Sequence, residues 1–258
     1  MMLWDFSLAW WVYPLLFLAA LFAGTMDTLA GGGGLITVPI LMSLGWTPQD
    51  ALGTNKFQAS FGSGSATLHF ARASAVNWSG VAWGIFFTAT GAALGAWAVG
   101  MLPVELLKRL IPVLLVVMAV YFMATPNLGM RERPPRLGLL SFHLIFGLGI
   151  GFYDGFFGPG TGSFWALCYV ALLGLELRQA TVSTKVMNFT SNIVSLAVFL
   201  FIARIHVIPG LVMAAGQFIG GRIGARLVLH KGAKLIRPVF VTVALVIALK
   251  LAYDGYIR

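Results

Sequence analysis

The sequence predicts an all-α integral membrane protein with about 8–10 transmembrane or re-entrant helices, arranged as two inverted repeats with glycine-broken half-helices. Three observations predict this class. Hydrophobic residues make up 59% of the 258 residues and charged residues 10%, and the mean hydropathy is +0.90, which is too apolar for a soluble domain. Long apolar runs recur along the chain. A glycine-rich segment with ionisable neighbours occurs twice.

The long apolar runs predict spanning helices, because lipid offers the backbone no hydrogen-bond partners outside the helix itself. These runs begin near Trp10, Ala51, Gly80, Val104, Leu137, Ala180, Val207 and Val239. Two shorter apolar stretches, 35–44 and 163–173, each follow a glycine cluster. Neither is long enough to cross a bilayer of about 30 Å alone. We expect them to be half-helices or re-entrant segments.

The two glycine-rich segments belong to a longer internal repeat. In the first copy GTMDTLAGGGGLITVPIL leads to ALGTNKFQAS, and in the second GFYDGFFGPGTGSFWAL leads to ATVSTKVMNFTSN. We expect a single membrane domain over 1–258, with one repeat at 10–124, a Pro- and Arg-rich linker at 125–136 and a second repeat at 137–258. If the short element of each half crosses, the number of crossings per half is odd, which predicts that the two halves are inverted.

The formal net charge of +9 is better explained by membrane topology than by nucleic-acid binding. The basic residues lie mostly in short connections or at predicted helix ends. The two most basic connections are MRERPPR at 130–136 and the stretch from Arg222 through Lys231 and Lys234 to Arg237. Lys and Arg are enriched in cytoplasmic loops, so both connections should face the cytoplasm and both termini should lie outside. The lipid bilayer is the expected partner.

The glycine clusters predict breaks in helices. Gly31, Gly32, Gly33 and Gly34 cannot form a stable helix interior, since each glycine costs about 1 kcal/mol relative to alanine. Gly158 and Gly160 mark the equivalent cluster, GPGTG. Unwound backbone at membrane depth can bind an anion through its free amides, helped by the positive end of the half-helix that follows. The alternative is close packing where two helices cross.

Four ionisable residues recur at matched places in the repeat. Asp27 and Asp154 precede the glycine clusters, and Lys56 and Lys185 lie early in the next long helices. Charges at membrane depth are costly unless they are paired or wetted, so their repetition indicates a role. The lysines and their polar neighbours are candidate ligands for an anion; these neighbours are Thr54, Asn55, Gln58, Ser183, Thr184, Asn188 and Asn192.

These charged residues also have structural interpretations. Each lysine could pair with an aspartate and fix the helix packing, or it could extend from a helix start to the membrane interface. The aspartates could carry protons during transport, since a buried carboxylate can take up a proton, or they could serve only as partners of the lysines. The sequence leaves both interpretations open.

The sequence gives little support for a disulfide, a metal site or a catalytic site. Cys168 is the single cysteine, so there is no disulfide framework and no multi-thiol metal site. The four histidines lack the spacing of paired metal ligands, and the chain has no GxSxG or Walker lysine motif. We expect no enzyme activity, no metal and no cofactor.

At these motifs the chain resembles the TauE/SafE family of sulfite and sulfonate exporters, also called the 4-toluene sulfonate uptake permease family, and within it the YfcA-like branch. The resemblance rests on AGGGGLITVPIL with ALGTNKFQAS, on GIGFYDGFFGPG and on GRIGARLVLHKGAKLIRP, and it covers nearly the whole chain. It implies a multi-pass transporter of the bacterial inner membrane for small anions such as sulfite or organosulfonates. In the second half the TNK motif is replaced by Ser183, Thr184 and Lys185, so the two halves need not contribute equally.

The sequence therefore favours a secondary transporter that works by alternating access around a central anion site, with proton coupling as an option, and the family resemblance implies the exporting direction. A passive anion channel would use the same donors. A non-transporting membrane scaffold would use the charged residues only for packing. The oligomeric state is left open, a homodimer included.

Overall fold

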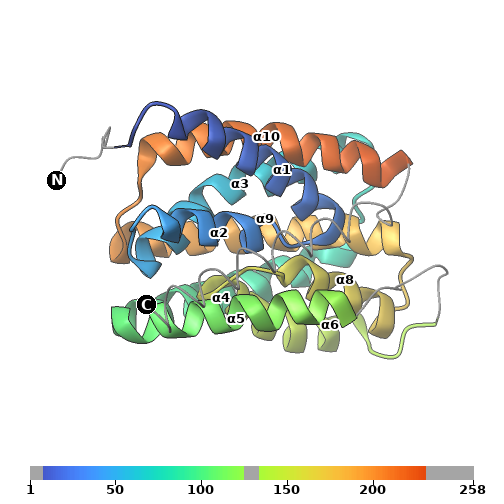
Figure 1. The fold of residues 1–258 in the computed structure, drawn as a ribbon. Coiled ribbons are helices and arrows are strands. Elements are labelled where there is room, and N and C mark those ends of the chain that lie inside the picture. The colour runs from blue at the N-terminus through green and yellow to red at the C-terminus, as the bar shows by residue number, and fades with distance from the viewer. Residues whose placement is uncertain (1–7, 125–133, 231–258) are drawn as a thin grey trace.

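A computed structural model describes residues 8–124 and 134–230, and in these ranges all regular structure is helical. The helices lie alongside one another in a bundle (Figure 1). The all-α class is therefore confirmed. The first half contains α1 (Val12–Ala30), α2 (Gly34–Ser43), α3 (Pro48–Arg72), α4 (Trp78–Met101) and α5 (Val104–Ala124); the second contains α6 (Leu139–Phe142), the π-helical turn η1 (His143–Gly147), α7 (Leu148–Phe156), α8 (Thr161–Leu172), α9 (Leu177–Ile202) and α10 (Val207–His230).

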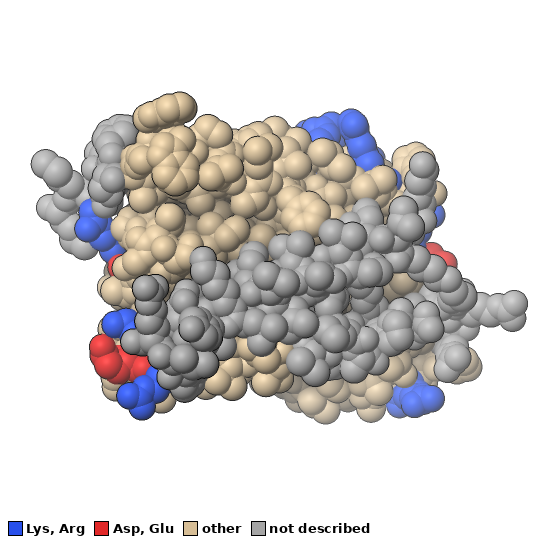
Figure 2. All heavy atoms as spheres, in the orientation of Figure 1, with Lys and Arg blue, Asp and Glu red and all other residues tan. Residues whose placement is uncertain are grey.

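Five helical segments of the described chain are long and apolar enough to cross a membrane: α1, α4, the continuous segment Leu139–Phe156, α9 and α10. The Lys and Arg atoms visible in Figure 2 lie toward the two ends of the bundle, as expected for a protein whose middle contacts lipid. The expected span beginning near Val239, the basic residues Lys231, Lys234 and Arg237 and most of the predicted linker lie outside the described residues.

The segments after the glycine clusters are short helices, as expected. α2 has 10 residues and α8 has 12. At about 1.5 Å per residue these helices are about 15 and 18 Å long, shorter than the hydrocarbon core of a bilayer. α2 follows α1, and α8 follows the continuous helical segment Leu139–Phe156, each after only a few residues. The lengths of α2 and α8 therefore confirm the expectation of half-helices.

The prediction of an apolar span beginning near Ala51 is wrong, because the helix found there is polar. The helix is present as α3, whose 25 residues begin at Pro48, but α3 is too polar to count among the five spans. Its polar side chains are buried inside the protein, because α9 and α10 pack against it. α3 is therefore a polar helix in the centre of the bundle; its buried polar residues are Thr54, Asn55, Lys56, Gln58, Ser60, Ser63, Ser65 and Thr67.

Local signals fix where these helices begin and end. Thr47 accepts a hydrogen bond from the backbone N–H of Asp50 at 3.2 Å, and Pro48 follows it, which is a favoured start for a helix. Asn77 caps α4 in the same way, accepting from the N–H of Gly80 at 3.1 Å. α1 ends at Gly31, whose left-handed φ of 76° is a common end for a helix.

The packing places α3 and α9 between two outer layers. α1 and α10 lie side by side along one face, and α4 packs against α7 on the other (Figure 1). Glycines allow both outer pairs to approach closely. A Cβ at Gly95 would overlap the carbonyl oxygen of Phe152, and a Cβ at Gly220 would overlap that of Leu21. In the described residues, the order of α1 to α4 recurs as the segment Leu139–Phe156, α8, α9 and α10, and the inverted orientation of the repeats stays a prediction.

Candidate functional site

The two glycine breaks meet in the centre of the bundle. Gly31 has φ 76° and donates its N–H to the carbonyl of Asp27 at 2.7 Å, which closes the end of α1. On the other side Gly158 has φ 92°, just before α8. A Cβ at Gly31 would overlap the backbone of Gly162, and the Ser163 hydroxyl donates to the carbonyl of Ala30. Close packing and unwound backbone therefore occur together at this crossing.

Lys56 of α3 is held by the end of α7. Its Nζ lies 2.6 Å from Oδ1 of Asp154 and 2.5 Å from the Asp154 carbonyl oxygen. The other carboxylate oxygen of Asp154 accepts a hydrogen bond from the Ser191 hydroxyl. The side chains of Lys56 and Asp154 are 1% and 5% exposed, so this ion pair is buried. A buried pair of this kind is stabilised only with further hydrogen bonds, and the carbonyl and the hydroxyl supply them.

Lys185 of α9 is held in the same manner by the end of α1. Its Nζ lies 2.8 Å from Oδ2 of Asp27 and 2.6 Å from the Asp27 carbonyl oxygen. The other oxygen, Oδ1, accepts a hydrogen bond from the N–H of Gly33 at 3.2 Å. Asp27 differs from its counterpart in exposure, since its side chain is 22% exposed. Of the two carboxylates, that of Asp27 is the more accessible.

The two ion pairs are crossed between the predicted repeats. Lys56 of the first binds Asp154 of the second, and Lys185 of the second binds Asp27 of the first. Both lysines are at most 1% exposed, so the interpretation in which they reach the membrane interface is wrong. Each lysine instead pairs with an aspartate, which was the other structural interpretation left open by the sequence. Since each pair joins the two halves, separating the halves must break or rearrange it.

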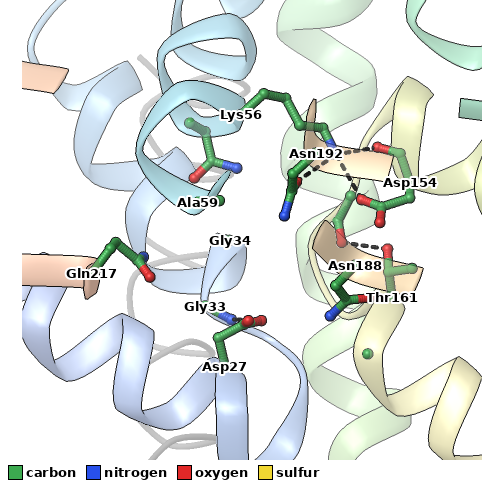
Figure 3. Close-up of a pocket in the computed structure, with 13 residues that line it drawn as sticks. Asp27, Gly33, Gly34, Lys56, Ala59, Asp154, Thr161, Asn188, Asn192 and Gln217 are labelled. Atoms are coloured by element: carbon green, nitrogen blue, oxygen red, sulfur yellow. Dashed lines mark hydrogen bonds and ion pairs between the residues drawn. The ribbon is translucent and has the colours of Figure 1, made fainter. Parts of the chain in front are cut away.

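A cavity lies between the two pairs (Figure 3). Its volume is about 30 Å³, which is room for on the order of two water molecules. Helices from both halves surround it. The described residues that line it are Asp27, Gly33, Gly34, Asn55, Lys56, Ala59, Asp154, Gly158, Thr161, Gly162, Asn188, Asn192 and Gln217.

Most of the candidate residues chosen from the sequence line this cavity. They are Asp27, Gly33, Gly34, Asn55, Lys56, Asp154, Gly158, Asn188 and Asn192. Asn192 accepts a weak hydrogen bond from Lys56 Nζ at 3.4 Å and donates to the Ser63 hydroxyl at 3.3 Å. The structure thus gathers amides, one ammonium group and two carboxylates from four separate segments around one space.

Other candidates stand behind the lining. Gln58 donates to Oδ1 of Asn55 at 2.8 Å, Thr54 accepts from the backbone N–H of His206 at 3.1 Å, and Lys185 reaches the cavity only through Asp27. The Thr184 hydroxyl is buried and has no hydrogen-bond partner among the described residues. The rest of the candidates do not line the cavity: Gly31, Gly32 and Gly160 shape the two breaks, and Ser183 is buried in α9.

Four lining residues were missed by the sequence reasoning. Thr161 and Gly162 lie inside the GPGTG segment and follow from it. Ala59 lies three residues after Lys56, as Asn188 lies three residues after Lys185, so the repeat itself was a signal. Gln217 is an isolated polar residue in the apolar helix α10, which is the signal expected of a functional residue inside a membrane protein.

The lining can bind a small anion if its charges rearrange. The ammonium and carboxylate groups of the two ion pairs sum to zero, so the cavity together with Lys185 behind it carries no net formal charge. Additional donors are the side-chain amides of the asparagines and Gln217 and the backbone amides at the glycine breaks. Among the described residues no group of three or more His, Cys, Asp or Glu side chains could hold a metal ion.

Comparisons with known proteins agree with the motifs. A family model described as "Sulfite exporter TauE/SafE" matches residues 16–251. The chain is 45% identical over 256 residues to "Probable membrane transporter protein YfcA" of Escherichia coli (strain K12), covering 98% of this chain and 95% of the relative. A "Probable membrane transporter protein" of Haemophilus influenzae is 44% identical over 240 residues, covering 93% and 94%. "Probable membrane transporter protein YunE" of Bacillus subtilis is 24% identical over 275 residues, covering 94% and 98%.

Proposed function

We propose that the chain, which belongs to the sulfite exporter TauE/SafE family of membrane transporters, exports small sulfur oxyanions, sulfite or organosulfonates, by alternating access at the central cavity. It is a multi-pass protein of the bacterial inner membrane. The observation that carries the proposal is the pair of crossed Lys–Asp contacts that line or adjoin one cavity between the halves.

An anion entering the cavity competes with the carboxylates for the lysines. In the closed arrangement the Lys56 ammonium is already bound by Asp154, so an oxyanion must replace that carboxylate or share the ammonium with it. Charge-assisted hydrogen bonds from an ammonium are among the strongest in proteins. Replacing a contact that joins the halves by a contact to substrate would free one half to move against the other.

Proton uptake would balance the charge of the substrate. A monoanion added to a cavity of zero formal charge leaves it at −1, which is costly in a poorly solvated site, and protonation of one carboxylate restores zero. We assign this proton to Asp27. Its side chain is 22% exposed against 5% for Asp154, and its second oxygen is held by a backbone amide rather than by a hydroxyl.

The passive channel and the scaffold make different predictions from the same residues. A channel needs a continuous wet path, whereas Lys56 and Lys185 are almost fully buried. A scaffold needs the ion pairs but no free space between them, and here a small polar cavity separates them. Both features favour an occluded carrier over these alternatives.

Ligand-induced stabilisation tests the proposal. The purified protein in detergent is heated with sulfite, sulfate, taurine or acetate, and a ligand at about 100 times its dissociation constant should stabilise the fold by about 2.7 kcal/mol. We expect stabilisation by sulfite in the wild type and none in Lys56→Met/Asp154→Asn, which removes both charges of one pair. Lys108→Met removes a charge from an exposed pair on α5 and should keep the response. No stabilisation by any sulfur oxyanion would refute the proposal.

A further inference from the structure

We propose that Gln217 is a specificity-determining residue of the central cavity, which restricts the substrate to a compact oxyanion without an organic substituent. The inference rests on the proposed function and deepens it, because it chooses sulfite over the organosulfonates. Gln217 belongs to α10, outside both glycine breaks and both lysine helices.

Two glycines hold the side chain of Gln217 against the cavity. It is 3% exposed and lines the space from the side opposite Asp154 in the view of Figure 3. The atoms nearest to a Cβ built at Gly62 of α3 all belong to Gln217, and its Oε1 would overlap that Cβ. A Cβ built at Gly24 of α1 would lie 2.7 Å from the same oxygen. The carboxamide therefore fills the room left by two missing side chains.

The side chains that line the cavity are mainly polar. Among the described residues that line it, Ala59 alone has a purely hydrocarbon side chain. The rest present backbone, amide, hydroxyl or charged groups. A bare oxyanion can accept hydrogen bonds from such a wall, and the uncharged amide of Gln217 can donate one without adding to the charge. An alkyl group would occupy the space of the carboxamide and leave polar groups unpaired.

The predicted repeat supplies no second glutamine. The contact of Gln217 with Gly24 corresponds to the contact of Thr88 with Gly151, which places Thr88 of α4 at the matching position. The Thr88 hydroxyl donates to Sδ of Met187 at 3.4 Å, and Thr88 does not line the cavity. Size selection at the cavity is therefore assigned to the α10 side alone.

Binding of sodium sulfite and sodium methanesulfonate to the purified full chain tests the assignment. Methanesulfonate is a monoanion that carries a methyl group on sulfur, so the titrations are run at a mildly acidic pH, where sulfite is mainly hydrogen sulfite and the two probes have the same charge. Titrations of thermal stability give both dissociation constants for the wild type, Gln217→Ala and Gln217→Glu. We expect Gln217→Ala to shift the ratio of the two constants toward methanesulfonate by about tenfold or more, the usual effect of one carbon group in a fitted pocket. Gln217→Glu, of the same size but charged, should weaken sulfite binding by at least about tenfold.

The neighbouring glycine provides an independent control. Gly62→Ala should displace the carboxamide and weaken sulfite binding, while the same change in a Gln217→Ala background should lower the melting temperature far less than it does alone. An equal drop in melting temperature in both backgrounds would contradict the contact between Gly62 and Gln217. A Gln217→Ala protein that binds sulfite and methanesulfonate in the wild-type ratio would overturn the specificity role and leave the proposed function standing. A wild type that binds neither probe would overturn both.

Discussion

Lys56 and Asp154 are 98 residues apart in the sequence, yet the Lys56 Nζ lies 2.6 Å from the Asp154 carboxylate. The lysine belongs to the first predicted repeat and the aspartate to the second. Lys185 and Asp27 form the reciprocal contact at 2.8 Å. The two halves are thus joined near their centre by two ion pairs, in addition to the apolar side chains of both halves that pack together.

Removing one member of the buried pair should cost more than removing both. Asp154→Asn leaves the Lys56 ammonium buried without a counter-charge and should lower the free energy of unfolding by about 3–5 kcal/mol. Adding Lys56→Met should recover a large part of that loss. Chemical unfolding in detergent measures both variants. Losses that simply add in the double variant would show that the two side chains do not stabilise each other.

The hydroxyl of Ser191 should contribute to the same pair. It donates to the buried carboxylate of Asp154, and hydrogen bonds to charged groups contribute about 1.5–3 kcal/mol. We expect Ser191→Ala to destabilise the protein by about that amount. Ser60→Ala is the matched control, because the Ser60 hydroxyl donates at 2.7 Å only to the carbonyl of Lys56 in its own helix. Equal melting temperatures for the two variants would contradict the assignment.

The crossing of the glycine breaks should not tolerate a side chain. Gly31→Ala meets both a φ of 76° and the backbone of Gly162, whereas Gly45→Ala meets a similar φ of 84° in open space. The control should lose about 1–2 kcal/mol from the backbone conformation alone. We expect Gly31→Ala to lose clearly more stability than Gly45→Ala in the same unfolding assay. Similar losses would mean that the close approach is easily relieved.

Asp27 should carry the coupled proton. In proteoliposomes with a pH-sensitive dye inside, sulfite efflux through the wild type should move more protons per sulfite than efflux through Asp27→Asn. Comparing the two proteins at one pH removes the protons that sulfite itself binds. An unchanged ratio in Asp27→Asn would transfer the coupling role away from this residue, with Asp154→Asn as the next variant to measure.

Much of this arrangement could be predicted from the sequence. The helix breaks at Gly31 and Gly158 and the short helices after them follow from local propensity, which neighbouring residues decide. The repetition of Lys56 and Lys185 in an apolar chain indicates a role for them, but it left open whether they are buried or extend to the membrane interface. The choice of partner for each lysine could not be predicted, because both aspartates are chemically equal and only the packing of α3 and α9 selects between them.

Other features depend on tertiary structure alone. The π-helical turn at His143–Gly147 sits in an ordinary apolar run, and no residue there marks the irregular turn in advance. From the sequence, α3 resembles a membrane span that carries unexplained polar residues. The structure explains them, because α9 and α10 cover its polar side chains. Gln217 could not be found from the repeat, because the two copies were matched at their charged residues and glycines. Thr88, the residue that matches Gln217, is neither charged nor a glycine.

Counterflow of sulfite tests the central claim most directly. Proteoliposomes loaded with unlabelled sulfite are diluted into radiolabelled sulfite, for the wild type, Lys56→Met/Asp154→Asn and Lys108→Met. An alternating-access carrier predicts saturable uptake that internal sulfite accelerates, lost in the first variant and kept in the second. Uptake that rises in proportion to concentration without acceleration by internal sulfite, or no sulfite flux through the folded wild type, would contradict the account.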